Sequence, residues 1–208
     1  MHCHRNARPT KSERNQTLPG DHIVAETAGQ VMHAVTIAAP PQTVWPWLVQ
    51  MGAGRAGWYS YDWIDNGGQP SATTIVAALQ DIAVGDIMPS LPGATTSFVI
   101  AAIQPFRDLV LTVPLASGGV LVSWEFALEP LGTDRTRLMV RGCVSALWPG
   151  RAVRRPRYPI EWIYWLLAHI PRWLMTPVAR FGHGVMQVRQ LNGIKRRAEI
   201  TVRLRRLR

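Results

Sequence analysis

The stretch that decides the fold is AAPPQTVWPWLVQMGAGRAGWYSYDWIDN, residues 38–66. Its two consecutive prolines suit the first turn of a helix, where a backbone N–H would have no partner. Apolar residues then follow at positions i, i+4 and i+7, namely Val44, Leu48 and Met51. This spacing predicts a short helix with Gly52 as its C-terminal stop. Pro46 lies inside that helix, so we expect a kink or a late start.

The second half of the stretch combines large rings with a few acids. Residues 58–66 (WYSYDWIDN) predict a second short helix, which the following pair of glycines ends. Asp62 and Asp65 are three residues apart, so on a helix both would share a face with Trp58. Amphipathic rings beside sparse acids are typical of a mostly apolar pocket with a few polar anchors. The stretch therefore predicts a binding site without identifying its ligand.

The composition is that of a globular domain with an unevenly distributed charge. The chain has 208 residues, of which 47% are hydrophobic and 17% charged, and most of its nine tryptophans lie at residues 45–63 and 148–173. Residues 1–20 carry a net charge of +3 and residues 151–208 carry +12, whereas residues 21–150 carry −5. Basic flanks attract anionic lipid or nucleic acid without specificity. No base-reading or stacking element accompanies them, so we expect no specific binding of nucleic acid.

The sequence predicts neither a disulfide framework nor a bound cofactor, because it has only two cysteines and none of the common cofactor-binding motifs. We expect Cys3 and Cys143 to be free thiols in a reducing, cytoplasmic compartment. The motif His2-Cys3-His4 offers three ligands in a polar terminus, which do not make a closed metal site. The sequence has no nucleotide-binding glycine loop, no G-x-S-x-G motif and no Cys or His pair at metal spacing within the domain, so we expect no metal and no cofactor. The first thirty residues lack an apolar signal segment, and the chain has no apolar run of about 20 residues that would span a membrane.

The rest of the chain is expected to form an antiparallel sheet followed by a long helix. Residues 1–28 are polar and basic without periodicity, so we expect a disordered N-terminal tail. Strand-like alternation begins at residue 31, and further strands follow between turns rich in Gly and Pro. The expected strands are Val31–Ile37, Asp86–Met88, Ser97–Ile103, Leu109–Val113, Val120–Glu129 and Arg137–Ser145. A final helix is predicted from near Pro177, and its apolar face, which would cover the sheet, contains Phe181, Val185, Val188, Leu191, Ile194 and Ala198.

Several of these segments resemble the SRPBCC superfamily, which contains START-like and polyketide cyclase/dehydrase-type proteins, and within it a bacterial branch of mostly uncharacterised members. The resemblance lies in APPQTVWPWLVQMG, RAGWYSYDWIDN, LQDIAVGDIMP, VSWEFALEP with TRLMVR, and LNGIKRRAE, which together cover residues 30–145 and 177–199. It implies an α+β helix-grip fold over residues 29–199. In that fold a curved antiparallel sheet wraps a long C-terminal helix and leaves an apolar cavity between them. The basic, aromatic insertion 150–176 and the Arg-rich tail 200–208 depart from the family pattern.

The aromatic residues supply candidate walls for the cavity that the resemblance implies. These are Trp58, Tyr59, Tyr61, Trp63 and Trp124. Trp124 shares one face of its predicted strand with Phe126, and we expect this face to line the cavity. Asp62 is a candidate polar anchor or, alternatively, a turn residue bonded to backbone N–H groups. Arg141 would either grip a ligand carboxylate from inside or form an outward salt bridge, for example with Glu125.

Three classes of function follow from these features. The first is a protein that binds a small hydrophobic molecule, lipid, sterol-like or polyketide-like, in the cavity. The second is a polyketide cyclase/dehydrase-type enzyme that uses Asp62 or a tyrosine for proton transfer. The third is a peripheral membrane protein that residues 151–176 and the basic tail recruit to anionic lipid. We expect the scattered histidines His33, His169 and His183 to be structural, and the sequence predicts no particular oligomeric state.

Overall fold

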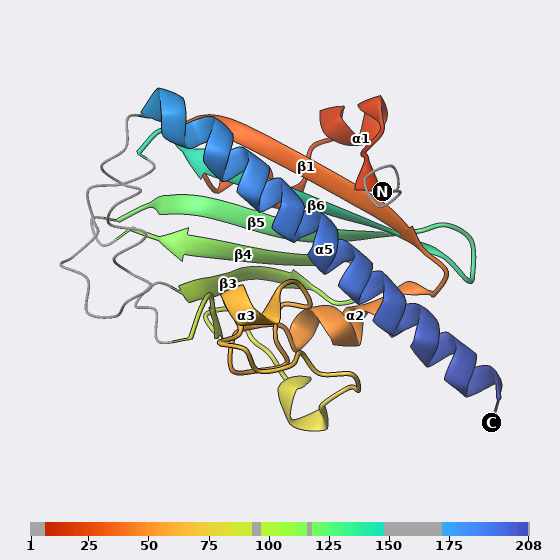
Figure 1. The fold of residues 1–208 in the computed structure, drawn as a ribbon. Coiled ribbons are helices and arrows are strands. Elements are labelled where there is room, and N and C mark those ends of the chain that lie inside the picture. Colours follow the sequence, from red (N-terminus) through yellow and green to blue (C-terminus); the bar gives the residue numbers. More distant parts are fainter. Residues whose placement is uncertain (1–6, 93–96, 116–117, 148–171, 208) are drawn as a thin grey trace.

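One antiparallel sheet and one long helix form the frame of the protein (Figure 1). The computed structural model describes residues 7–92, 97–115, 118–147 and 172–207. Six strands lie in the order β1-β6-β5-β4-β3-β2, and the 35-residue helix α5 crosses one face of the sheet. After a short N-terminal segment, one strand, two short helices, five strands and the long helix follow one another. This order and the sheet topology confirm the helix-grip fold that the resemblance to the SRPBCC superfamily implied.

The elements agree closely with those expected from the sequence. The strands are β1 (Thr27–Ile37), β2 (Ile87–Pro89), β3 (Ser97–Gln104), β4 (Asp108–Pro114), β5 (Val120–Pro130) and β6 (Thr136–Ser145). The helices are α1 (Lys11–Asn15), α2 (Pro41–Val49), α3 (Asp62–Asp65) and α5 (Arg172–Arg206), with 3-10 turns η2 (Pro19–His22) and η3 (Ala77–Leu79). Because α5 continues to Arg206, most of the expected tail 200–208 is helix.

Helix α2 begins directly at Pro41 and contains Pro46, so the late start considered from the sequence is not observed. The missing N–H of Pro46 would have donated to the carbonyl of Gln42, four residues earlier. Gln42 is exposed, so water can satisfy that carbonyl. The opposite side of the helix is buried, and neither Val44 nor Leu48 has any exposed surface.

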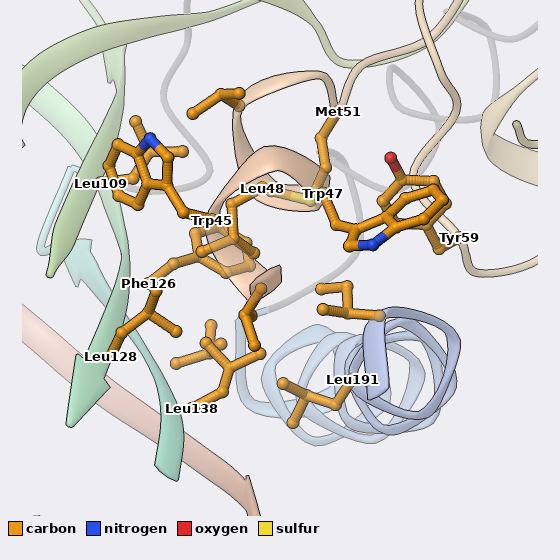
Figure 2. Packing of buried hydrophobic residues seen from close by; sticks show 14 of the residues in the cluster. Trp45, Trp47, Leu48, Met51, Tyr59, Leu109, Phe126, Leu128, Leu138 and Leu191 are labelled. Carbon is orange, nitrogen blue, oxygen red and sulfur yellow. The ribbon is translucent and has the colours of Figure 1, made fainter. Parts of the chain in front are cut away.

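The core lies between α5, α2 and the inner face of the sheet. Alternate residues of β5 point toward α5, so Phe126 and Leu128 are buried there. Helix α5 contributes three residues without exposed surface at three- and four-residue steps, namely Leu191, Ile194 and Ala198. Figure 2 shows the α2 side chains that fill the space beside them, Trp45, Trp47 and Leu48.

Phe181 was expected on the same apolar face of α5 but is 75% exposed. It lies ten residues before Leu191, which places it about 80° around the helix from that residue. An α-helix has 3.6 residues per turn, so a series of three- and four-residue steps gradually moves around the helix and does not stay on one face. This explains why Phe181 was wrongly assigned to the apolar face. Gln187 is the buried residue in that part of the helix.

Helix α5 comes very close to the backbone of the loop after α2 at the point where Gly193 faces Tyr59. A Cβ at residue 193 would overlap the carbonyl oxygen of Tyr59, so a larger residue does not fit. Tyr59 has a φ of 61°, a left-handed conformation that costs free energy in a bulky residue. Ser71 Oγ accepts the Tyr59 N–H at 3.2 Å, and Gln50 Nε2 donates to the Tyr59 hydroxyl at 2.9 Å. The Arg197 guanidinium lies 4.4 Å from the centre of the ring, so α5 itself helps to hold this conformation.

Residues 7–26 pack on the outer face of the sheet, so the expectation of a disordered tail over residues 1–28 is wrong for this described part. Arg141 projects from β6 and donates to the carbonyl oxygens of Glu13 and Gln16, each at 2.8 Å. It also pairs with Asp21 at 2.6 Å, and Arg137 pairs with Glu13 at 2.7 Å. Outward arginines thus bind the carbonyls and carboxylates of an irregular segment, which orders it without any hydrophobic periodicity.

Glu125 is buried beneath this N-terminal segment. Its exposed fraction is 1%, and its Oε2 accepts the N–H of Gly20 at 2.7 Å. Its Oε1 has no hydrogen-bond partner among the described residues. Burial raises the pKa of Glu125 to about 7; Asp108 and Asp21 add to this rise, while the Gly20 N–H and Arg141 oppose it.

Some expectations fall on residues that the structure does not describe. These are Cys3 with the His2-Cys3-His4 motif, His169, and residues 150–171 of the expected insertion. Cys143 is a buried free thiol, and burial raises the pKa of that thiol. No helix within the described ranges is long and apolar enough to cross a lipid bilayer.

Replacing Gly193 by alanine should force α5 away from Tyr59 and destabilise the protein by about 2 kcal/mol, because the added methyl group overlaps backbone. Gly182 of the same helix is the matched control, since a Cβ there meets nothing within 4 Å. Gly182→Ala should stabilise the protein by up to about 1 kcal/mol through helix propensity. Urea unfolding followed by circular dichroism measures both effects. A Gly193→Ala variant as stable as the wild type would contradict the close approach.

The raised pKa of Glu125 predicts a stability that falls as pH rises. In the unfolded chain this carboxyl ionises near its usual value of 4.5, whereas in the folded protein it keeps its proton to about pH 7. The folded state therefore binds more protons between these values, and its free energy of unfolding declines across that window. Glu125→Gln keeps an acceptor for the Gly20 N–H and removes the charge. We expect the free energy of unfolding of this variant to exceed that of the wild type by at most about 3 kcal/mol at pH 8. At pH 5 the two values should differ little. A difference in urea midpoint that is equal at both pH values would refute this account.

Candidate functional site

Five rings gather between the sheet and α5 and form what we call the aromatic cluster. Its members are Trp58, Phe98, Trp124, Phe126 and His183. Trp124 lies at the centre, with its ring 4.9 Å from Phe126, 5.1 Å from Phe98 and 5.4 Å from Trp58, measured between centroids. The rings come from four elements: β3, β5, α5 and the loop after α2. The cluster therefore exists only when the sheet and the helix are both in place.

Hydrogen bonds fix the two indoles of the cluster. Trp124 Nε1 donates to Gln187 Oε1 at 2.9 Å, and Gln187 Nε2 donates to Gln190 Oε1 at 2.7 Å. Both glutamines are 2% exposed, so they form a buried polar pair on α5. Trp58 Nε1 donates to the carbonyl of Ser90 at 3.0 Å. Because the indole N–H of Trp124 is satisfied, the uncovered part of its ring is the binding surface that remains.

Two histidines stand beside Trp124. The His183 ring lies 6.3 Å from Trp124 and 6.5 Å from His33, which projects from β1. Burial lowers the pKa of His183 to about 4, with a smaller contribution from His33, and burial also lowers the pKa of His33. Both imidazoles are therefore neutral at pH 7, and each can donate one hydrogen bond and accept another. His33 Nδ1 is buried and has no partner among the described residues.

The structure brings two of the predicted wall residues, Trp58 and Trp124, into direct contact. Trp58 is buried with 3% exposure, whereas Trp124 is half-buried. Tyr59 is fully inside the core, where burial raises the pKa of its phenol and Gln50 donates to its hydroxyl. Its ring packs on Trp47 and under Arg197 and is part of the frame of the fold.

The other two predicted wall residues lie outside the cluster. Tyr61 is half-buried, and the guanidinium of Arg189 lies 5.7 Å from its ring centre. Trp63 is 75% exposed, because it occupies the outer side of the single-turn helix α3. No contact of Trp63 with the cluster occurs in the described part of the chain.

The two predicted polar anchors are both engaged elsewhere. Asp62 accepts from the Ser71 hydroxyl and from the Ser71 N–H, the latter at 3.0 Å, so it acts as a turn residue. Arg141 lies on the outer face of the sheet, directly across from Glu125 in the β5–β6 register. The register places its neighbour Gly142, and not Arg141, opposite Trp124. Arg141 is therefore no anchor for a ligand beside the aromatic cluster.

Asp65 is a buried carboxylate that the pattern of paired aspartates did not distinguish from Asp62. Its exposed fraction is 3%, and neither oxygen has a well-formed hydrogen bond to a described residue. Burial raises its pKa to about 6, and the charge of Asp62 adds to the rise, while the Ser60 hydroxyl and nearby backbone amides reduce it. The carboxyl therefore titrates closer to neutral pH than an exposed aspartate does.

The two histidines were classed as structural in the sequence, although a signal for their position was present. His33 lies two residues from both Val31 and Val35, so the three side chains share the inward face of β1. His183 precedes Gln187 by one helical turn on the face of α5 that contains Leu191. Neither pattern revealed that the two side chains meet, since that depends on where α5 crosses β1.

The comparisons with known proteins concern fold alone. No protein-family model and no curated protein matches the chain. Among solved structures, protein MLL2253 from Mesorhizobium loti is 16% identical with a TM-score of 0.47, over 83% of this chain and 98% of its own. The Zhui aromatase/cyclase from Streptomyces sp. R1128 is 16% identical with a TM-score of 0.47, over 84% of this chain and 95% of its own. The polyketide-cyclase-like protein Cgl2372 from Corynebacterium glutamicum is 16% identical with a TM-score of 0.46, over 83% of this chain and 93% of its own.

The lowered pKa of His183 is directly measurable. We expect its imidazole resonances to stay constant from pH 8 to pH 5.5 and to change with a midpoint near 4, because burial disfavours the charged ring. Since the unfolded state gains this proton first, the same shift makes stability fall as pH drops from about 6.5 toward 4. His183→Gln identifies the resonance and should reduce that acid sensitivity. A midpoint near 6.5 would mean that water reaches the ring freely.

Proposed function

We propose that the protein binds a small, largely apolar and uncharged molecule against the aromatic cluster. The observation that carries this proposal is the state of Trp124, which contacts four other rings yet remains half-buried. A ligand that covers the rest of this ring gains the free energy of removing apolar surface from water. The hydrogen bond to Gln187 supports the proposal, because a ring already held in place loses little entropy on binding.

The polar groups beside the cluster favour a neutral ligand. His33 and His183 are uncharged at pH 7, so neither imidazole offers a charge for a ligand to pair with. Among the described residues, no lysine, arginine or carboxylate is hydrogen-bonded to the aromatic cluster. These features favour a lipid-, sterol- or polyketide-like molecule with sparse polar atoms.

A polyketide cyclase/dehydrase-type reaction is the alternative, and it requires a group that transfers a proton near neutral pH. Asp62 is bonded to Ser71, and the buried Tyr59 phenol has a raised pKa. Asp65 titrates in a suitable range, but its 3% exposure separates it from solvent. The residues thus support binding more than catalysis.

Titration with the neutral apolar dye N-phenyl-1-naphthylamine tests the proposed site. Trp124→Ala should weaken dye binding about tenfold or more, since a covered ring contributes 1.5–3 kcal/mol. Trp63→Ala is the matched control and should leave the affinity unchanged, because Trp63 is 75% exposed outside the cluster. Trp124→Phe, which keeps a smaller ring, should fall between the two. Equal affinities of the Trp124→Ala variant and the wild type would contradict the site.

Native mass spectrometry of protein purified from its own host identifies the natural ligand. We expect a stoichiometric apolar molecule in the wild type that organic extraction removes and that the Trp124→Ala variant retains poorly. Incubation of the extracted molecule with fresh protein then separates the two functions, because a change in its mass indicates turnover. Protein that is empty in repeated preparations and that binds no dye would overturn the proposal.

A further inference from the structure

The C-terminal end of α5, residues 195–207, is apolar on two opposite sides. Its inner side faces the core through Ala198, which has no exposed surface, and Val202. Its outer side carries a stripe of three residues at helical spacing, Ile200, Leu204 and Leu207, with exposed fractions of 40%, 57% and 83%. Figure 1 shows this end of the helix extending past the sheet. Nothing in the described residues covers the stripe.

Basic residues flank this outer stripe. Arg196, Arg203 and Arg206 are exposed and form no ion pair within the described part of the chain. The one acid in residues 195–208 is Glu199, which is already bonded to Lys195 at 2.7 Å and to the Ala38 N–H at 3.0 Å. Glu199 also attracts Arg203, yet one carboxylate does not neutralise these cations, so the outer side of the helix keeps an excess of positive charge.

The remaining basic residues of this helix end serve the fold. Arg197 donates to the carbonyl of Ala72 at 2.8 Å, and Arg205 donates to Thr43 Oγ1 at 3.3 Å. Their inward direction distinguishes them from Arg203 and Arg206. The outer charges are thus not needed to hold α5 on the sheet.

A hollow lies along the same outer side of the helix. It has a volume of about 300 Å³, and it is lined by Asn192, Lys195, Arg196, Glu199, Ile200 and Arg203. The two guanidinium groups and the Lys195 ammonium outnumber the Glu199 carboxylate in this shallow hollow, so it suits a phosphate oxygen, which accepts bidentate hydrogen bonds from arginine. Ile200 places apolar surface directly next to these donors.

We propose that the end of α5 docks on an anionic lipid surface. Ile200, Leu204 and Leu207 would enter the boundary of the acyl chains, while Arg196, Arg203 and Arg206 would meet lipid phosphates. Charge complementarity selects an anionic bilayer, and the exposed leucines distinguish it from nucleic acid, whose backbone offers no apolar surface to cover them. This docking surface includes the basic tail 200–208 considered from the sequence but none of the segment 151–176, and it adds an apolar stripe to the charge of that tail. It is independent of the aromatic cluster.

Vesicle flotation of the full chain tests this surface with two double variants. We expect the wild type to float with vesicles of phosphatidylcholine and phosphatidylglycerol, not with phosphatidylcholine alone, and to be released by salt. Leu204→Ser/Leu207→Ser should lose flotation. Arg203→Gln/Arg206→Gln should weaken the partition coefficient about tenfold or more, at roughly fivefold per charge. Arg135→Gln/Arg180→Gln, two exposed arginines elsewhere, loses the same charge and should stay within about twofold of the wild type.

Each contrary result overturns a stated part of the proposal. If the Leu204→Ser/Leu207→Ser variant still floats, the apolar stripe is not part of the membrane contact. If the Arg135→Gln/Arg180→Gln control loses as much flotation as Arg203→Gln/Arg206→Gln, vesicle binding depends on net charge alone. Absence of wild-type flotation, or tighter binding to duplex DNA than to anionic vesicles, refutes docking on lipid. Circular dichroism and the unfolding midpoint verify that each variant keeps its fold, which is expected because the substituted side chains are exposed.

Discussion

The contact between Gly193 and the backbone of Tyr59 is the constraint on which the rest of the structure depends. It sets how closely α5 lies on the loop after α2, and Arg197 then reaches over the Tyr59 ring. The same placement brings Gln187 to the indole of Trp124. A strained left-handed tyrosine persists here because its N–H, its hydroxyl and its ring are each held by a separate partner. The site is thus built by the same contact that closes the fold.

The two faces of the sheet have opposite chemistry, and each needs its own cover. The inner face is apolar and is covered by α5 and α2. The outer face contains Glu125 and Arg141, which are both nearly inaccessible to water. Buried polar groups require partners, and the N-terminal segment supplies them: Asp21 and backbone carbonyls bind Arg141, and the Gly20 N–H binds Glu125. This explains why an apparently featureless segment is part of the domain.

The sequence allowed the fold to be predicted well and the site only in part. Alternation along β5 correctly placed Trp124 and Phe126 on the inner face, because strand periodicity is a local property. The position of Arg141 depends on the pairing register of β5 and β6, which no local pattern contains. Trp63 was assigned to the cavity because of its ring, but α3 has a single turn and exposes it. The roles of His33 and His183 depend on where a distant helix crosses an edge strand, and this is a tertiary property.

The position of Gly193 within α5 has a mechanical consequence. It lies ten residues after His183 and eleven before Leu204, so these two residues are each about 15 Å along the helix from the contact. An uninterrupted helix of this length behaves as a stiff rod. A tilt of about 4° around the contact therefore moves His183 and Leu204 about 1 Å in opposite directions. Close-packed rings tolerate much less than that, so the packing on Trp124 is sensitive to any force applied to the far end of the helix.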